Sequence, residues 1–522
     1  MKKTITLLAS LTVAIAHSQS VPNKNSVPEN FLKTYQAPIF TDAERLRKLE
    51  AAYPVAEKLY RDWAEKAHFP GMAFGIVVDG KLMHSGGFGY TDVAKKTVAT
   101  SKSLFRIASM TKSFTTMAVL KLRDEGKLRL DDPAYLYVPE LKNLTYVTRD
   151  SPLITVRNLM THSAGFPEDN PWGDRQLSDT EKELTDLIKG GLSLSNATGI
   201  AYEYSNLAFA MLGRIITTVS GKPYQQYITD AILKPLGMNS TEWEYTKVPA
   251  NLLAHGYRWQ GEQWQEEELL HDGSHGAMGG LITSIDDFAK YMAFHQSAWP
   301  PRSDAETGPV KRSSVREMQQ PWTFNNLAAG FKYPSGRACP MVSSYGYGLR
   351  WSRDCEGRVM VGHTGGLPGF GSQWWVLPEY GIGVVAYGNL TYASMGNVNF
   401  AVLDTLINLA GLKTRQLPVS PILAQRKAEL VQLLPDFTKA EASKIFAENF
   451  FPDLPVELRR KAIQDLYAKV GKIKQVGELI PENQLRGRFL LEGERGKINV
   501  FFTLTPENPA LIQQLDFREV TQ

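Results

Sequence analysis

The sequence predicts a mixed α/β protein of the α+β type, in which helices flank an antiparallel sheet and a helical block interrupts it. Two observations lead to this fold class. Apolar stretches typical of strands lie far apart, at residues 72–90 and 345–387. Residues 131–330 between them carry helical periodicity and irregular segments. We therefore expect one discontinuous sheet, antiparallel because short turns join its neighbouring strands.

The first elements follow from capping and turn signals. Residues 41–59 predict a helix that begins with a Thr-Asp-Ala-Glu cap. Residues 72–90 predict two strands joined at Asp79-Gly80, a pair typical of type I′ hairpin turns. A short strand at 105–107 runs into a helix over 109–125.

The later elements come from the same periodicities. Helices are predicted at 207–219, 285–293 and 395–412, and strands at 345–351, 358–362, 372–377 and 381–387. After Leu412 the composition changes. Charged helices are expected at 425–434, 439–446 and 455–470, and strands at 487–491 and 497–503. This part is predicted to be a small α+β domain. It contains no histidine, which favours an accessory or interaction role over a catalytic one.

The first residues form a separate segment. Lys2-Lys3 precedes an apolar run over 5–16, and Ala16-His17-Ser18 has small residues at both positions that define a cleavage site. This pattern predicts a bacterial signal peptide and therefore a periplasmic or secreted protein. The expected organisation is a signal peptide (1–18), a flexible lead (19–40), the main domain (41–412), a linker (413–424) and an accessory α+β domain (425–522).

Composition excludes several classes of protein. Of the 522 residues, 43% are hydrophobic and 21% charged, which is typical of a globular protein rather than a disordered one. Lys and Arg (58) nearly balance Asp and Glu (54), and no basic stripe is visible. Nucleic acid is therefore not expected as a partner. No stretch approaches the ~20 apolar residues of a membrane-spanning helix.

Cys339 and Cys355 are the two cysteines of the chain. In an oxidising compartment they could form a disulfide, but sequence alone leaves pairing and free thiols equally open. Two cysteines are too few for a thiolate zinc site of the usual four-ligand kind.

The strongest candidate for a catalytic motif is Ser109-Met110-Thr111-Lys112, because it lies directly after a predicted strand and at the start of a predicted helix. Positions i and i+3 share one face of a helix, so the Ser109 hydroxyl and the Lys112 amine can meet. A serine needs a neighbouring base to become a nucleophile. A lysine in apolar surroundings can supply that base, because desolvation lowers its pKa.

Two further motifs strengthen this interpretation. Tyr204-Ser205-Asn206 stands just before the 207–219 helix, and a tyrosine beside a lysine can share acid and base work. Gly362-His363-Thr364-Gly365-Gly366 follows the predicted strand 358–362. A glycine-rich strand edge can hold an extended substrate through main-chain hydrogen bonds.

With these three motifs in this order, the chain resembles the serine β-lactamases and penicillin-binding proteins, in particular the class C branch with its Tyr-x-Asn motif. The stretches 159–165 and 279–284 also resemble the wider family. The resemblance covers residues 46–412. It implies a β-lactamase/DD-peptidase-like fold and no cofactor or metal.

The resemblance also implies residue roles. Ser109 would be the acylated nucleophile, Lys112 its base and Tyr204 the proton relay to the leaving group. Asn206 would hold the substrate amide, while His363, Thr364 and Gly365 would line the site. The backbone N–H groups of Ser109 and Gly366 would form the oxyanion hole. His363 is a departure, since antibiotic-handling members have lysine there. A neutral histidine holds a carboxylate less firmly, which favours peptidases and esterases over efficient β-lactamases.

Three other histidines are expected to be structural rather than functional residues. His271 and His275 stand four residues apart, but Gly273 and Gly276 disfavour a helix there and no third ligand is placed, so a loop is expected rather than a metal site. His162 precedes a serine that lacks the G-x-S-x-G pattern and is expected to begin a turn.

Three function classes remain. The leading hypothesis is a secreted serine hydrolase that cleaves an amide bond of a D-amino-acid-containing or peptidoglycan-derived peptide. The second is an esterase or weak class C-like β-lactamase using the same acyl-serine chemistry. The third is a sensor that is acylated and stops. The expected partner is a small-molecule or peptide substrate, and the C-terminal domain is a candidate interaction module.

Overall fold

The computed structural model describes residues 30–520, so the expected signal peptide and the first part of the lead lie outside the described residues. Within this range the main sheet has nine strands in the order β3-β2-β1-β13-β12-β11-β10-β9-β8. Their bounds are β1 (Gly71–Val78), β2 (Lys81–Asp92), β3 (Thr97–Val98), β8 (Thr323–Ala328), β9 (Met341–Tyr345), β10 (Arg350–Asp354), β11 (Val359–Leu367), β12 (Phe370–Leu377) and β13 (Ile382–Gly388). Every pairing in this sheet is antiparallel.

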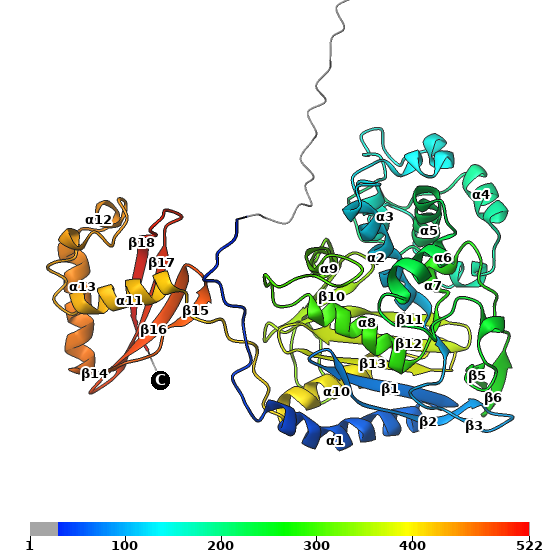
Figure 1. Cartoon of the computed structure of the whole chain (residues 1–522), viewed down its shortest axis with the longest axis horizontal. Coiled ribbons are helices and arrows are strands. Elements are labelled where there is room, and N and C mark those ends of the chain that lie inside the picture. Colours follow the sequence, from blue (N-terminus) through cyan, green and yellow to red (C-terminus); the bar gives the residue numbers. More distant parts are fainter. Residues whose placement is uncertain (1–29, 521–522) are drawn as a thin grey trace, which may run out of the picture. The chain divides into compact units, whose positions relative to one another are not determined.

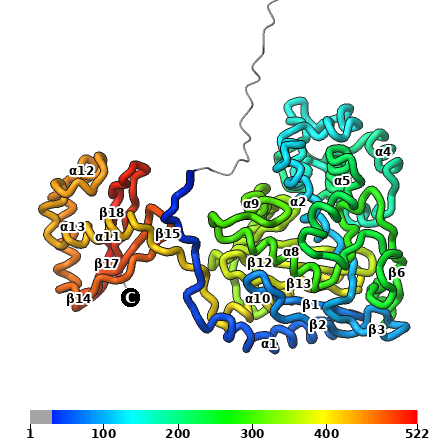
Figure 2. Tube along the Cα trace, viewed as in Figure 1, coloured from blue at the N-terminus to red at the C-terminus, as the bar shows by residue number. Residues whose placement is uncertain are grey.

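The pairing of β1 with β13 joins the two ends of the main domain. Met72 faces Gly388, and the register runs to Val78 opposite Ile382. Figure 2 shows the blue β1 beside the yellow-green β13, although some three hundred residues lie between them. The predicted α+β fold with one discontinuous antiparallel sheet is therefore confirmed.

Helices cover both faces of this sheet. Helices α1 (Arg45–Lys66) and α10 (Gly396–Leu409) lie together on one face, and α8 (Ile285–Ser297) packs on β1, β2 and β13 from the other (Figure 1). Side chains alternate along a strand. In β1, Phe74 and Ile76 accordingly join the core under α1 and α10, whereas Ala73 and Val77 join the larger core around α2 (Thr111–Asp124).

The helical block lies between β4 (Phe105–Arg106) and β8 and stands above the sheet in Figure 1. Its α-helices are α3 (Val156–Met160), α4 (Glu181–Lys189), α5 (Asn206–Ser220), α6 (Tyr224–Ile228) and α7 (Gly276–Gly279), and α9 (Arg312–Met318) follows α8. The hairpin β5 (Gly256–Gln260) with β6 (Gln263–Glu267) and the short pair β4 with β7 (Ile282–Thr283) complete this region.

The turns explain where the sequence-based predictions succeed and fail. Asp79 and Gly80 both have positive φ (48° and 77°), as a type I′ turn requires, so the β1–β2 hairpin is confirmed. The predicted single strand at 345–351 is wrong, because a turn separates β9 from β10. Gly348 in this turn has φ 61°, and a Cβ there would lie 2.6 Å from the Lys112 carbonyl oxygen. The positive φ and the close approach to α2 both favour glycine at this position.

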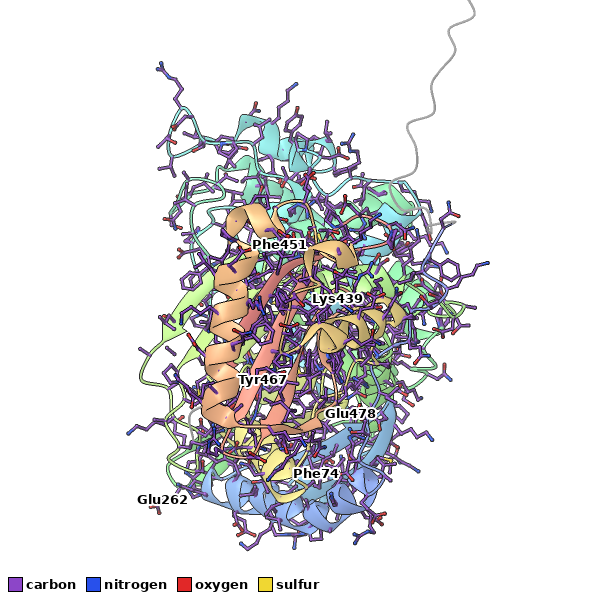
Figure 3. The ribbon with its side chains drawn as sticks, turned by 90° about the vertical axis from the view of Figure 1, so that its left-hand side faces the viewer. Phe74, Glu262, Lys439, Phe451, Tyr467 and Glu478 are labelled. Carbon is purple, nitrogen blue, oxygen red and sulfur yellow. A yellow bond between two sulfur atoms is a disulfide. The ribbon has the colours of Figure 1, made fainter. Side chains whose placement is uncertain are left out.

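The C-terminal region has a core of its own. Helices α11 (Pro421–Leu433), α12 (Phe450–Asp453) and α13 (Val456–Val470) accompany a five-stranded sheet in the described chain, made of β14 (Ile473–Val476), β15 (Ile480–Asn483), β16 (Arg486–Gly493), β17 (Lys497–Leu504) and β18 (Ile512–Glu519). Figure 3 shows α13, on which Tyr467 lies, running alongside these strands. Alternate residues of β17, Ile498, Val500 and Phe502, point into this core.

Two predictions for this region need correction. Helix α11 begins at Pro421 rather than at 425, because Ser420 caps it by accepting a hydrogen bond from the Leu423 N–H. The predicted helix at 439–446 is only a short 3₁₀ turn at Glu441–Ser443, which ends where Lys444 takes φ 56°. Within residues 30–520, no helix is both long and apolar enough to cross a bilayer.

Cys339 and Cys355 form a disulfide, with their Cα atoms 5.2 Å apart. The bridge ties the segment before β9 to the turn after β10. The question that the sequence left open is thus answered in favour of pairing.

Replacing both cysteines with alanine is expected to lower the free energy of unfolding by ~3 kcal/mol, because a cross-link across a loop of this length restricts the unfolded chain. Urea denaturation measures this. Reductant should destabilise the wild type to the same extent and leave the double variant unchanged. Equal midpoints for the oxidised wild type and the variant would contradict a stabilising bridge.

Candidate active site

Ser109 lies in the short 3₁₀ helix η1 (Ala108–Met110), between β4 and α2. Its neighbour Ala108 is fully buried and has φ 50°, in the left-handed region that alanine rarely adopts. Such strain persists only where the surrounding structure imposes it, and it gathers at functional sites. Here the Ile107 N–H donates to the Leu281 carbonyl, and the Ile107 carbonyl accepts from the Ser372 hydroxyl (2.7 Å).

Lys112 follows on the first turn of α2, with its side chain fully buried. Its Nζ donates to Ser109 Oγ (3.0 Å), Asn206 Oδ1 (2.7 Å) and the Met278 carbonyl (2.8 Å). Burial lowers the pKa of Lys112 to about 7, and the positive charge of Arg350 acts in the same direction. The carboxylates of Asp174 and Asp169 oppose this shift. Lys112 can therefore give up its proton near neutral pH.

Tyr204 packs beside this pair. Its ring centroid lies 4.9 Å from Lys112 Nζ, and its hydroxyl interacts with the Ser109 side chain. Burial holds the pKa of Tyr204 well above its usual range, while the interaction with Ser109 and the charge of Arg350 partly offset that rise. Tyr204 is therefore a neutral phenol with a proton to share, directly at the Ser109 hydroxyl.

The start of α5 positions Tyr204 and Asn206. Ser205 is its N-cap, and the Asp169 carboxylate accepts from the N–H groups of Asn206 (2.7 Å) and Leu207 (2.8 Å). His162 Nδ1 accepts from the Ser205 N–H (3.1 Å). Burial keeps the pKa of His162 well below its usual value, so it acts as a neutral acceptor that fixes the motif.

The third motif lies inside β11 rather than after it, because β11 continues to Leu367. His363 is fully buried. Its Nδ1 lies 2.5 Å from the Thr364 carbonyl and its Nε2 lies 2.8 Å from the Tyr345 hydroxyl. A carbonyl only accepts, so Nδ1 carries the proton and Nε2 accepts from Tyr345. Burial, Arg350 and Lys112 keep the pKa of His363 well below its usual value.

His363 lies next to the site, with its ring centroid 6.3 Å from that of Tyr204. Both of its ring nitrogens are engaged by groups of the protein. Thr364 is partly exposed on the same strand. Asn206 is also fully buried, with its Oδ1 on Lys112 and its Nδ2 donating to Asn170 Oδ1 (2.6 Å).

The glycines of β11 allow the strand to lie against η1. A Cβ at Gly365 would collide with the Ile107 carbonyl and the Ser372 hydroxyl. Gly366, by contrast, is partly exposed. The N–H groups of Ser109 and Gly366 thus belong to two elements in direct contact, the arrangement that an oxyanion hole needs.

Two charged residues at the site were missed from sequence. Arg350 begins β10 opposite Gly362 of β11, and its guanidinium carbon lies 5.7 Å from the Tyr204 ring centroid. Asp174 is buried beside Asn206, whose Nδ2 donates to its Oδ1 at 3.4 Å. Burial raises the pKa of Asp174 to about 6, and Lys112 limits that rise. Long-range packing brings both residues here, and no local motif marks them.

The histidines considered for a metal have separate partners. His271 Nδ1 pairs with Glu244 at 3.0 Å, while His275 is buried with Nδ1 3.8 Å from Asp179. In the part of the chain that the structure describes, no group of three or more His, Cys, Asp or Glu side chains could hold a metal ion.

The fold and the buried cluster of Ser109, Lys112 and Tyr204 are typical of serine hydrolases that act through an acyl-enzyme. Residues 52–407 match the family described as Beta-lactamase. The chain belongs to this family, as the order of its three motifs predicts.

Known relatives agree with this assignment. Protein flp of Staphylococcus aureus (strain NCTC 8325 / PS 47) is 31% identical over 331 residues, or 62% of this chain, and the chain spans 61% of that relative's length. D-alanyl-D-alanine-carboxypeptidase/endopeptidase AmpH of Escherichia coli (strain K12) is 28% identical over 72% of this chain and 97% of its own length. The octameric penicillin-binding protein homologue from Pyrococcus abyssi shares the fold, with a TM-score of 0.57 and 23% identity over 90% of this chain and 99% of its own.

The protonation of Lys112 predicts a pH profile. Only neutral Lys112 can accept the Ser109 proton, so acylation of Ser109 by a p-nitrophenyl ester should rise with pH through about 7. Asp174→Asn removes a charge that favours the ammonium form, so this rise should move to lower pH. Stopped-flow release of p-nitrophenol measures both profiles.

Asp62→Asn is the control, because Asp62 lies exposed on α1, where it pairs with Lys58. Its profile should coincide with that of the wild type. If the pH dependence of acylation were the same for Asp174→Asn and the wild type, this would contradict the electrostatic link between Asp174 and Lys112.

Proposed function

We propose that the protein is a secreted serine hydrolase that cleaves an amide bond of a D-amino-acid-containing or peptidoglycan-derived peptide through an acyl-Ser109 intermediate. The observation that carries this proposal is the 3.0 Å hydrogen bond from Lys112 Nζ to Ser109 Oγ inside a buried site. The name of the relative AmpH, a D-alanyl-D-alanine-carboxypeptidase/endopeptidase, supports the choice of substrate class.

In acylation, Ser109 Oγ attacks the amide carbon and its proton passes to Lys112 Nζ. The N–H groups of Ser109 and Gly366 stabilise the oxyanion. The C–N bond then breaks, Tyr204 delivers its proton to the departing nitrogen, and Lys112, whose Nζ lies 4.9 Å from the Tyr204 ring centroid, gives the proton that it took from Ser109 to Tyr204. In deacylation, water attacks the ester carbon and its proton returns to Ser109 Oγ by the same relay.

Arg350 gives the site a preference for substrates with a free carboxylate. It is the cation beside Tyr204 and β11, whereas His363 is neutral. An arginine fork pairs with a carboxylate through two parallel hydrogen bonds. We therefore expect a peptide with a free C-terminal carboxylate to bind with that carboxylate at Arg350. The carboxylate belongs to the fragment that leaves when the amide bond breaks.

The same chemistry supports a second candidate function, that of an esterase or weak class C-like β-lactamase. The neutral His363 favours the esterase over the β-lactamase, since no lysine charge stands at that position. A sensor that is acylated without turnover would use the same acylation step.

The disulfide between Cys339 and Cys355 supports an oxidising compartment, in line with the proposed export from the cytoplasm. We assign the C-terminal α+β domain an accessory role, because its sequence holds no histidine and none of the three motifs.

The nucleophile and base are tested by substitution. Ser109→Ala and Lys112→Ala should each lower kcat/KM for D-Ala-D-Ala peptides by at least about a thousandfold. The nucleophile and its base act as one unit, so the loss of either residue removes most of the activity that the pair provides. Product formation followed by mass spectrometry measures this, with L-peptides, short esters and a chromogenic β-lactam screened in parallel. Activity of Lys112→Ala within about tenfold of the wild type would contradict its role as base.

Arg350 is tested by pairing a protein variant with a substrate variant. Arg350→Ala should lower kcat/KM for a peptide with a free C-terminus by about a hundredfold, and should affect the C-terminally amidated peptide far less. Arg353→Ala on the same strand is the control, and it should preserve the ratio of the two substrates. Equal losses on both peptides would assign Arg350 a structural role only.

A further inference from the structure

Asp174 takes part in none of the steps above, yet the fold fixes it beside the site. It lies in the short turn Gly173–Gln176 and is 2% exposed. The preceding Gly173 packs directly on Asn206, since a Cβ there would lie 2.7 Å from Asn206 Cβ. The Asp174 carboxylate therefore belongs to the wall of the site that Asn206 forms.

Tyr392 stands on the opposite wall, in the loop after β13. The loop is anchored at Thr391, whose N–H donates to the Tyr257 carbonyl (2.8 Å) and whose Oγ1 accepts from the Gly369 N–H (2.8 Å). Tyr392 has φ 51°, and its Cδ1 lies only 3.1 Å from the position of a Cβ on Gly366. The ring thus lies over Gly366, where β11 contributes to the oxyanion hole.

The Tyr392 hydroxyl and the Asp174 carboxylate bring the two walls together. They interact closely, and burial together with this carboxylate raises the pKa of Tyr392 to about 12. Ser109 is connected to both walls, because its partner Lys112 donates a hydrogen bond to Asn206 and because η1, which carries Ser109, contacts β11. Tyr392 itself is 42% exposed, so the bridge runs along the outer rim of the site.

We propose that Tyr392 and Asp174 form a clasp across the acyl side of the site, with Tyr392 as the residue that limits the length of the acyl group. The inference rests on the proposed acylation of Ser109 and adds a specificity to it. An acyl chain held between Asn206 and β11 meets the Tyr392 ring where it passes Gly366. A longer chain must displace the ring and separate it from buried Asp174, which disfavours the longer chain.

The test compares acylation of Ser109 by p-nitrophenyl acetate, butanoate, hexanoate and octanoate, read as the mass of the adduct over time. Tyr392→Ala should raise the octanoate-to-acetate ratio of acylation rates by at least about tenfold. Tyr392→Phe keeps the ring and loses the hydroxyl, so it should raise the ratio less. Asp174→Asn should also raise it, and the ratio cancels any effect of this change on Lys112.

Tyr137→Phe is the matched control. It removes a Tyr–Asp hydrogen bond outside the site, in which the Tyr137 hydroxyl donates to Asp132 Oδ2 at 2.7 Å, and it should leave the ratio as in the wild type. An unchanged ratio in a folded Tyr392→Ala, or in Tyr392→Phe and Asp174→Asn if the alanine variant does not fold, would overturn the clasp. Absence of any Ser109 adduct in the wild type would instead overturn the proposed function, so the two failures differ.

Discussion

The rest of the site depends on the burial of one amine, that of Lys112. A fully buried ammonium is costly unless hydrogen bonds and opposite charges compensate, and otherwise the group gives up its proton. Here three acceptors meet the amine and the carboxylates of Asp169 and Asp174 favour its charge, yet burial still lowers its pKa to about 7. Both the charged and the neutral form of Lys112 are therefore populated near neutral pH, and its partner Ser109 lies 3.0 Å away, where the neutral form can act as a base.

The discontinuous sheet makes this burial possible. It sets β11 against η1, so that Gly365 of β11 packs on Ile107 and Ala108, the residues directly before Ser109. The helical block closes over the same point, because Asp169 and His162 hold the start of α5 with Asn206 directed at Lys112. Segments distant in sequence thus surround one amine. The strained φ of Ala108 lies at their junction, where tertiary contacts over-determine the backbone.

The sequence could predict what local patterns encode. Hairpin chemistry located Asp79-Gly80, helix spacing paired Ser109 with Lys112, and motif order indicated Tyr204, Asn206 and β11. It could not predict Arg350, Asp174 or Tyr392, since each reaches the site through pairings between distant residues and carries no motif. The contact of His363 with Tyr345 could not be predicted for the same reason, because Tyr345 lies on β9, two strands away. The turn between β9 and β10 was missed although Gly346 and Gly348 signal it locally, and the packing of Gly348 on α2 could not be predicted from sequence.

The most direct test of the central claim is the protonation state of Lys112 itself, measured without any substrate. In protein carrying ¹³C at lysine Cε, the Cε resonance reports the charge on Nζ, and Lys112→Arg identifies the signal by removing it. We expect one lysine resonance that titrates at about pH 7 and is absent from the variant. A Lys112 resonance that titrates above about pH 10, with the exposed lysines, would contradict a role of Lys112 as base, because the amine would then be a permanent cation and could not take the Ser109 proton.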